Sequence, residues 1–253
     1  MSPTSTAAAQ FDRVADAYAT SAVHAEGADL ARLVKILSPA GTWDVLDVGT
    51  GAGHAALAVA PSVARVTAVD VSAKMLAVTE RLCAERDITN IEVVQVDGHS
   101  LPFAAARFDG AVSRFSAHHW ADPDRVVEET RRVLRPGASF VLIDSICPVP
   151  GSLDTFLNAL ELLRDPSHAR NDRLSQWGNR FTRLGFVVRD EEEWLLELEV
   201  EAWLRRSATV PWRAEACRKL LAEAPTEARS ALAIAADGSR FSIPCALIRA
   251  ERR

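Results

Sequence analysis

The chain has 253 residues, of which 48% are hydrophobic and 25% are charged. This balance is typical of globular proteins and argues against disordered, collagen-like and coiled-coil classes. The net charge of −5 repels polyphosphates, which makes a large nucleic-acid surface unfavourable.

Cysteine spacing and hydropathy indicate the cellular compartment of the protein. The four cysteines lie far apart, with no C-x-x-C and no zinc-ligand spacing, so we expect reduced thiols and no metal centre. No apolar run approaches the roughly 18 residues of a membrane span, and the first ten residues lack the basic region of a secretory signal. These features predict a soluble, cytoplasmic protein. The cysteines are Cys83, Cys147, Cys217 and Cys245.

The first 146 residues alternate between helical and strand patterns. Apolar residues at three- and four-residue spacings predict two helices within residues 1–40. Short apolar runs then predict strands at 43–48, 65–71, 91–96, 108–113 and 139–146. Helical patterns separate them at 54–60, 72–85, with Ser72 as a candidate N-cap, and 123–134. Strand–helix alternation of this kind predicts a parallel sheet that helices cover on both faces.

After residue 146 the alternation stops. Further helices are expected at 153–163, through 177–184, around 203 and within 211–234, and two strands at 186–198 and 241–250. We find no internal repeat and no low-complexity linker, so the whole of 1–253 is expected to form one domain. Its parts are N-terminal cap helices (1–40), a cofactor-binding core (43–146), and substrate-cap helices with the last strands (147–253).

The most informative motif is Val45-Leu-Asp-Val-Gly-Thr-Gly-Ala-Gly-His54, where an apolar strand runs into Gly49, Gly51 and Gly53 and then into a helix. A glycine-rich turn here lets a ligand approach the backbone closely. Alone it is ambiguous, because dinucleotide enzymes use a similar G-x-G-x-x-G turn and an ordinary strand–helix turn can also contain glycines.

Two acidic residues narrow the choice. Asp70 ends the second predicted strand, 21 residues after Gly49, where a carboxylate can accept hydrogen bonds from both hydroxyls of a ribose. The alternative role for Asp70 is a helix N-cap. Asp97 ends the third predicted strand, where its carboxylate can accept from an exocyclic adenine amine.

This array resembles the class I S-adenosylmethionine-dependent methyltransferases. The resemblance covers residues 43–146, including Phe108-Asp-Gly-Ala-Val-Ser113 and Arg132-Val-Leu-Arg-Pro-Gly137, after which the family usually has a second glycine in place of Ala138. Ser116-Ala-His-His-Trp-Ala-Asp122 is most similar to the menaquinone/ubiquinone-methyltransferase-like small-molecule branch. Three outer segments resemble toxoflavin-type azapteridine N-methyltransferases: residues 18–24, 164–168 and 235–239.

The resemblance implies a Rossmann-like, doubly wound α/β fold. Its seven strands would have the order 3-2-1-4-5-7-6, with the last strand antiparallel and a helical cap over the carboxyl ends. The implied cofactor is S-adenosyl-L-methionine, with S-adenosyl-L-homocysteine as product and no metal; the glycine turn, second-strand acid and third-strand acid hold methionine, ribose and adenine respectively. Cofactor contacts are expected from Tyr18, Asp47, Gly49, Gly51, Gly53, Asp70, Val71, Met75, Asp97, Gly98 and Arg114.

Histidines are the candidates for catalysis. A general base is useful when the acceptor is a phenol, an acidic carbon or a ring N–H. His118 and His119 follow the fourth predicted strand, whose carboxyl end borders the ligand crevice, and His119 is the first choice. His24 lies on the N-terminal helices that in this family close over the cofactor. Each of these histidines can instead simply pack or cap, and His168 is expected to fix a helix terminus.

Other chemistries have less support. Tyr18 is the only tyrosine, so an Asn/Asp-Pro-Pro-Tyr amino-methyltransferase motif has no match. Cys245 follows a proline as in cytosine-C5 enzymes, but its alternating apolar neighbours predict a core thiol. The tryptophans of the C-terminal third can line an aromatic pocket or serve as core. They are Trp177, Trp194, Trp203 and Trp212.

The expected function is methyl transfer from S-adenosylmethionine to a small molecule, a heterocycle or aromatic compound of secondary metabolism, by a monomer or homodimer that binds neither nucleic acid nor membrane. One alternative is an NAD(P)-dependent oxidoreductase, which the G-x-G-x-G pattern and Asp97-Gly98 disfavour. Another is a noncatalytic cofactor-binding scaffold that needs a partner subunit. Carbon, nitrogen and oxygen acceptors all stay open.

Overall fold

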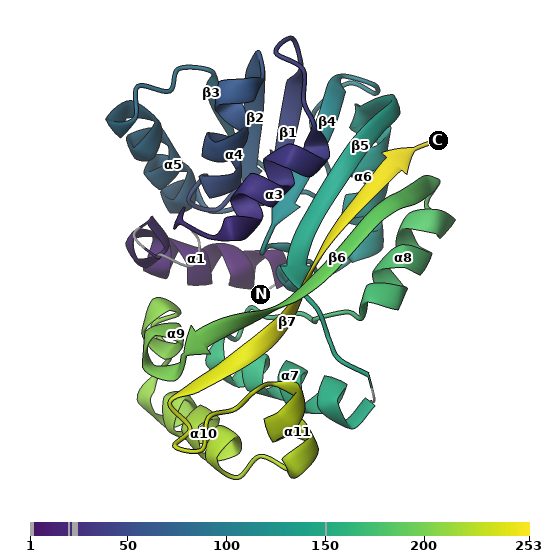
Figure 1. Ribbon diagram of the computed structural model, residues 1–253. Helices are drawn as coiled ribbons and strands as arrows, with labels where there is room; N and C mark the ends of the chain where they lie inside the picture. The colour runs from purple at the N-terminus through teal and green to yellow at the C-terminus, as the bar shows by residue number, and fades with distance from the viewer. Residues whose placement is uncertain (1–2, 20, 22–24, 150) are drawn as a thin grey trace.

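One sheet of seven strands forms the centre of the computed structural model, which describes residues 3–19, 21, 25–149 and 151–253 (Figure 1). The strand order is β3-β2-β1-β4-β5-β7-β6, and β7 is antiparallel to both of its neighbours. The predicted order and the antiparallel last strand are confirmed. The strands are β1 (Asp44–Val48), β2 (Arg65–Asp70), β3 (Ile91–Gln95), β4 (Phe108–Arg114), β5 (Leu134–Ser145), β6 (Phe186–Glu199) and β7 (Arg240–Arg252).

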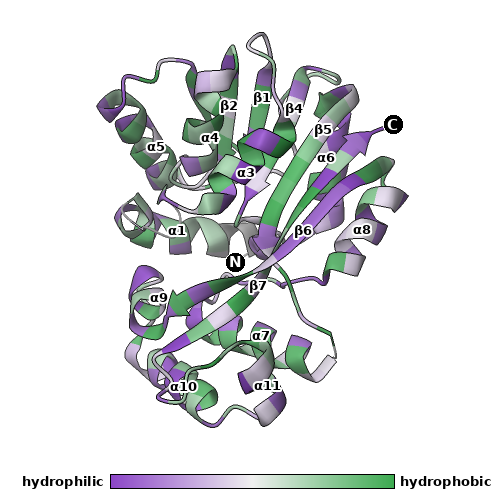
Figure 2. Ribbon diagram, in the orientation of Figure 1, coloured by the Kyte–Doolittle hydropathy of each residue, from purple (hydrophilic) through white to green (hydrophobic). Residues whose placement is uncertain are grey.

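Helices bury both faces of the parallel part of the sheet. On one face, α3 (Ala28–Leu37) and α4 (His54–Val59) pack in a shared core with β1, β2 and β4. On the other, α6 (Pro123–Val133) and α8 (Leu174–Arg183) pack with the same strands. Strands buried on both faces must be apolar along their length, and Figure 2 shows hydrophobic residues along most of β5.

The N-terminal helix α1 (Pro3–Ala19) lies across the carboxyl ends of the parallel strands (Figure 1). It packs against α5 (Ala73–Glu85), whose predicted N-cap is confirmed, because the Ser72 hydroxyl accepts a hydrogen bond from the Met75 amide at 3.1 Å. The same hydroxyl donates to the Asp12 carboxylate on α1 at 2.6 Å. This pair of contacts holds α1 over the edge of the sheet where the functional residues lie.

The antiparallel strands β6 and β7 extend beyond the sheet and support a second hydrophobic core. Pairing of β5 with β7 ends at Ser145 and Cys245, whereas β6 and β7 stay paired as far as Glu199 and Arg240. Four helices gather around this extension (Figure 1). They are α7 (Gly151–Arg164), α9 (Val200–Arg206), α10 (Pro211–Ala222) and α11 (Thr226–Ala231).

Two element boundaries differ from those expected. Strand β5 begins at Leu134, which pairs with Phe108, but the next pair is Ser139 with Gly110, so Arg135-Pro-Gly137 forms a bulge within β5, with Gly137 at φ +79°. The helical region 211–234 is divided before Pro225, whose ring disfavours helical backbone in the preceding residue.

All four cysteines are free and buried. None of the helices in the described ranges is long and apolar enough to cross a membrane.

Candidate functional site

Two neighbouring pockets lie at the carboxyl edge of the sheet. The first, named here the glycine-loop pocket, encloses about 960 Å³ including its mouth. It is lined by Ala7, Phe11, Tyr18, Asp47, Val48, Gly49, Thr50, Gly51, Ala52, His54, Ala55, Asp70, Val71, Met75, Val96, Asp97, Gly98, His99, Arg114, Phe115, Ser116, His119, Trp120 and Val126.

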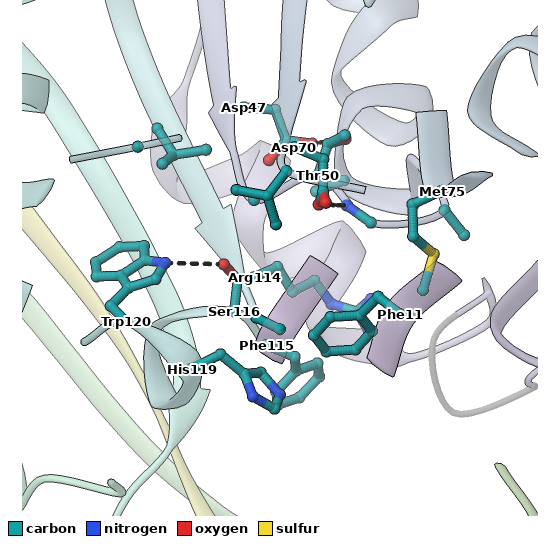
Figure 3. A pocket seen from close by; sticks show the side chains of 18 of the residues that line it. Phe11, Asp47, Thr50, Asp70, Met75, Arg114, Phe115, Ser116, His119 and Trp120 are labelled. Carbon is teal, nitrogen blue, oxygen red and sulfur yellow. Dashed lines mark hydrogen bonds between the residues drawn. The ribbon is translucent and has the colours of Figure 1, made fainter. Parts of the chain in front are cut away.

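The glycine turn needs its glycines for different reasons. Gly49 has φ +68°, and a Cβ there would lie 1.9 Å from the hydroxyl of Ser116, which the Trp120 indole N–H also contacts at 3.1 Å (Figure 3). Gly51 has φ +55° with open space around it, so its backbone conformation alone favours glycine. Gly53 does not line the pocket; it packs against Thr79 at the start of α4.

Asp70 ties the glycine turn to the next helix. One carboxylate oxygen accepts the Gly51 amide at 2.8 Å and the other accepts the Ser72 amide at 2.9 Å. Since Ser72 is the N-cap of α5, the alternative role of Asp70 as that cap is not observed. Burial raises the pKa of Asp70. Carboxylate oxygens have two lone pairs each, so both can also accept hydrogen bonds from a ligand.

Asp47 is a fully buried carboxylate with one oxygen unused. Its Oδ2 accepts from the Thr50 hydroxyl at 2.7 Å and from the Ala56 amide at 3.1 Å. Its Oδ1 has no hydrogen-bond partner among the described residues. Burial raises the pKa of Asp47 to about 6. A cationic ligand group would stabilise the ionised form of this side chain.

Asp97 and Gly98 lie on the wall of the same pocket, after β3. The Asp97 carboxylate accepts the His99 amide at 3.0 Å and contacts the His99 ring. The hydrogen bond between the His99 ring and the Asp97 carboxylate raises the pKa of His99. His99 was not a predicted site residue, although it stands two positions after the predicted acid. The third-strand acid therefore lies in the pocket with the first two.

The second cavity, named here the arginine pocket, adjoins the first and encloses about 520 Å³ including its mouth. Phe11, Tyr18, Phe115 and His119 line both pockets. Figure 3 shows Phe115 and His119 side by side, below Arg114 and Ser116. The remaining lining residues of the arginine pocket are His118, Ser145, Glu161, Arg164, Leu196, Leu198, Trp203, Arg206, Ile243 and Cys245.

His118 is held by Asp144, at the end of β5. The His118 Nδ1 atom lies 2.6 Å from one carboxylate oxygen, and the other accepts backbone amides, including Ala117 at 2.6 Å and His118 at 3.2 Å. Although burial opposes it, the charge of Asp144 raises the pKa of His118. The pairing therefore favours the protonated form of His118 and the ionised form of Asp144.

His119 has the opposite electrostatic environment. Burial, followed by the nearby charge of His118, lowers its pKa to about 4. Its Nδ1 lies 3.1 Å from the Ser167 carbonyl, which can only accept, and 3.2 Å from the Ser167 hydroxyl, which donates its own proton to Asp165. Nδ1 therefore carries the proton and Nε2 is the basic nitrogen. The ring stands edge-on to Phe11, with 4.8 Å between centroids. His119 is thus a neutral imidazole where the two pockets meet.

Of the other predicted site residues, Val71 and Met75 line the glycine-loop pocket. Arg114 does too, but its guanidinium forms a buried ion pair with Asp29 on α3. Tyr18 lies between the pockets, and its phenol oxygen accepts hydrogen bonds from Arg164 and Arg206. His24 lies outside the described residues.

Other candidates lie near the pockets or away from them. His168 contacts the Asn158 side chain within α7 at 3.0 Å and lines neither pocket, and its expected role at a helix terminus stays a prediction. Cys245 lines the arginine pocket, but burial raises its pKa well above the ordinary value, which keeps it a thiol. Among the tryptophans, Trp203 lines the arginine pocket, whereas Trp177 belongs to the core and Trp212 is exposed.

Sequence reasoning missed the charged residues of the arginine pocket. Asp144 had a local signal, because it is the one acid in the apolar run 140–146. Glu161 and Arg164 stand within a mainly apolar helical pattern, and Arg206 stands in a charged stretch beside the exposed Arg205. Their meeting depends on contacts between α7, α9 and α1, which no local pattern specifies.

A sheet of this order, with a glycine turn after β1 and acidic residues at or near the carboxyl ends of its first three strands, defines the class I methyltransferase architecture. Residues 46–142 match the family model described as "Methyltransferase domain". The chain is 35% identical over 224 residues to the uncharacterised methyltransferase YcgJ of Bacillus subtilis, which covers 88% of each chain. The crystal structure of YcgJ superposes with a TM-score of 0.86 at 33% identity, covering 88% of this chain and 97% of YcgJ.

A demethylmenaquinone methyltransferase of Clavibacter sepedonicus is 35% identical over 147 residues, covering 56% of this chain and 59% of that protein. The chain belongs to the S-adenosylmethionine-dependent methyltransferases, as the sequence resemblance predicts. The methyl donor is S-adenosylmethionine, and the predicted dehydrogenase alternative is wrong. The similarity to azapteridine N-methyltransferases stays a prediction.

The residues of the glycine-loop pocket fit this donor. Asp47 Oδ1 is a buried acceptor without a partner among the described residues, which suits the α-ammonium group of the methionine moiety. Asp70 has free lone pairs for the ribose hydroxyls, and the space around Gly51 admits a ligand close to the backbone.

Proposed function

We propose that this methyltransferase acts on a small-molecule acceptor, aromatic or heterocyclic, that occupies the arginine pocket. The observation that carries the proposal is the shared wall of the two pockets, formed by Phe11, Tyr18, Phe115 and His119. A donor in one pocket and an acceptor in the other would meet at these four side chains. All four carry planar aromatic rings, which suits contact with a planar acceptor ring.

In its bound form the sulfonium donor supplies an activated methyl group, so the protein chiefly has to align the reactants and exclude water. Proximity and orientation can contribute roughly 7–11 kcal/mol to lowering the barrier. The glycine turn and the strand-end acids would fix the donor, and α1 would cover it through Phe11 and Tyr18. The apolar side chains Leu196, Leu198 and Ile243 would keep water from the acceptor.

His119 is the proposed general base where the nucleophile carries a proton. Its Nδ1 donates to the Ser167 carbonyl, which leaves Nε2 to accept that proton. His118 is less suitable, because its pairing with Asp144 favours the protonated ring. A general base typically contributes a factor of about 10² to 10⁴. The proposed site residues for the cofactor are those predicted from the sequence, without Gly53, whose contacts are structural.

The acceptor can be found by isotope labelling. We would incubate the purified protein with deuteromethyl-labelled donor and either an extract of small molecules or candidate heterocycles and quinols. A product that is heavier by one labelled methyl group identifies the acceptor. Transfer by the purified chain alone also excludes a scaffold that needs a partner subunit. If no labelled product forms with the extract or with any candidate, the proposal of a small-molecule acceptor is contradicted.

The role of His119 is tested by comparing His119→Ala with His168→Ala at saturating donor. We expect His119→Ala to lower kcat by about 10² or more with little effect on donor affinity, and His168→Ala to lower mainly the melting temperature. Because the pKa of His119 is lowered to about 4, kcat/KM for the acceptor should stay level from pH 8 to 6. Near-wild-type turnover of His119→Ala would instead mean that alignment alone suffices.

A further inference from the structure

The arginine pocket combines an apolar wall with two guanidinium groups. Leu196, Leu198 and Ile243 come from β6 and β7, and Trp203 comes from α9. Arg164, the last residue of α7, and Arg206, the last residue of α9, bring positive charge to the same cavity. Such a pocket would hold a molecule with a hydrophobic body and a polar end.

Arg164 already has partners within the protein. Its Nε donates to the Trp203 carbonyl at 3.1 Å, and its guanidinium lies over the Trp203 ring, 5.0 Å from the centroid. It also pairs with the Glu161 carboxylate at 3.5 Å. Of the described residues that line the arginine pocket, Glu161 alone carries a carboxylate. The charge of Arg164 is therefore balanced before any ligand binds.

Arg206 is different. No described residue forms an ion pair with it, and its buried Nε has no hydrogen-bond partner in the described part of the chain. It contacts the Tyr18 phenol oxygen, which it shares with Arg164. Burial, followed by the like charge of Arg164, lowers the pKa of Arg206, while the charge of Glu161, which already pairs with Arg164, acts in the opposite direction. A half-buried charge that has no carboxylate of its own is costly for the protein alone.

The other charged groups nearby have partners of their own. His118 lines the arginine pocket, and Asp144, 2.6 Å away, is the partner for its protonated form. Asp165 is bound by the Ser167 hydroxyl at 2.6 Å, and its charge interacts with His119 and Arg164. Among the described lining residues, the Arg206 guanidinium is therefore the one side-chain charge without a paired carboxylate of its own.

We propose that the arginine pocket recognises an acceptor bearing an oxyanion, a carboxylate or a phosphate, with Arg206 as its counter-ion and the apolar wall against its hydrophobic body. This inference rests on the proposed function, because it takes the arginine pocket as the acceptor site. Guanidinium groups suit both anions, since their parallel N–H groups match two oxygens at once. The anion would anchor the acceptor so that its nucleophile faces the shared wall at His119.

The test uses matched probes on the full chain saturated with S-adenosylhomocysteine. Benzoate and phenyl phosphate are the anionic probes, and benzamide is a neutral probe of the same shape as benzoate. We expect at least one anion to bind at least tenfold more tightly than benzamide in a calorimetric or NMR titration. The better anion also indicates whether the natural group is a carboxylate or a phosphate.

Variants then assign the effect to one side chain. Arg206→Met should lower the affinity for the anion at least tenfold and leave that for benzamide unchanged, whereas Arg206→Lys should retain part of it. The control is Arg205→Met, since Arg205 precedes Arg206 on α9 but is exposed and lines neither pocket. Unchanged binding of S-adenosylhomocysteine by every variant verifies that the fold is intact.

Three results would overturn the inference: benzamide binding as tightly as the anions, anion binding that survives Arg206→Met, or no saturable binding of either anion. The isotope-labelling assay distinguishes this failure from failure of the proposed function. A labelled product that is neutral or cationic at pH 8 would support methyl transfer to a small molecule. It would contradict the proposal that the acceptor carries an oxyanion. A labelled acid whose formation falls at least tenfold in Arg206→Met, but not in Arg205→Met, supports both.

Discussion

A buried carboxylate with an unused oxygen disfavours its own ionisation, and Asp47 is such a group, with its pKa raised to about 6. If the donor's ammonium binds this oxygen, the ionised form is the one that binds. The affinity for S-adenosylhomocysteine should then fall as the pH drops through 6, by about tenfold between pH 7.5 and 5. Calorimetric titrations over that range measure it.

The control for this pH dependence is Asp47→Asn, which keeps an oxygen for Thr50 and Ala56 but cannot ionise. We expect this variant to bind S-adenosylhomocysteine more weakly and with a flatter pH profile. A wild-type affinity that stays constant from pH 7.5 to 5 would contradict the assignment of Asp47.

Asp70 is expected to contribute both to donor affinity and to the stability of the fold. Asp70→Ala should weaken the affinity for S-adenosylhomocysteine by about 1.5–3 kcal/mol, the scale for hydrogen bonds to charged groups, and Asp97→Asn should weaken it less. The sequence alone suggests little loss of stability. In the structure Asp70 also accepts the Gly51 and Ser72 amides, so denaturant unfolding should show a loss of roughly 1–3 kcal/mol as well.

The result that would contradict the ribose assignment is normal affinity in a folded Asp70→Ala variant. Val71→Ala is a useful comparison, because Val71 lines the same pocket without a side-chain hydrogen bond to offer. It should affect affinity less than Asp70→Ala does.

At the residue scale, the sequence was most informative where function depends on local spacing. Gly49, Gly51 and Asp70 could be found because a turn and a strand end fix their relation within a few residues. Arg206 and Asp144 could not, because their partners come from distant segments: Asp144 binds His118, 26 residues away, and Arg206 meets Tyr18 from α1. The sequence around a single charged residue contains no periodic pattern from which a partner in a distant segment can be predicted.

At the element scale, α1 connects the two pockets. It supplies Phe11 and Tyr18 to both, while Gln10 donates from α1 to the Ser207 carbonyl after α9 at 2.9 Å. Since a bound donor would be covered by this helix, donor binding should suppress its local opening. We expect amide hydrogen exchange in α1 to slow at least several-fold with S-adenosylhomocysteine, as measured by mass spectrometry.

The helices α10 and α11 provide the internal reference for this experiment. None of their residues lines either pocket, so their exchange should change little. Equal slowing in α1, α10 and α11 would indicate general stabilisation instead of contact with α1, and no slowing in α1 would contradict its place over the donor.

Most element boundaries followed from short-range chemistry. Ser72 and Asp122 cap the helices that follow them, and Pro123 occupies the first turn of α6, where its missing N–H costs nothing. The early start of β5 was harder to read, because Arg135-Pro-Gly137 has the composition of a turn. Its inclusion depends on pairing of Leu134 with Phe108, a contact between strands that lies outside the local sequence.

At the scale of the whole molecule, alternation of strands and helices predicted a parallel sheet, but the strand order came from the family resemblance. Alternation alone does not state that β7 inserts between β5 and β6. It also does not show that β6 and β7 continue past the sheet, which is what places α7 and α9 beside the glycine-loop pocket. The arginine pocket exists because of this extension, so it was the least predictable part of the site.

The whole fold should respond to donor binding as one cooperative unit. A ligand that binds only the native state stabilises it by RT ln(1 + [L]/Kd), which is about 2.7 kcal/mol at a hundredfold excess over Kd. For a chain of this size, 1 kcal/mol corresponds to roughly 2–4 °C in Tm. S-adenosylhomocysteine at that excess should therefore raise Tm by about 5–10 °C, whereas NADH should not change it. Because Asp70→Ala binds more weakly, the same ligand concentration should shift its Tm less, and equal shifts with NADH would contradict the assignment of the glycine-loop pocket to the methyl donor.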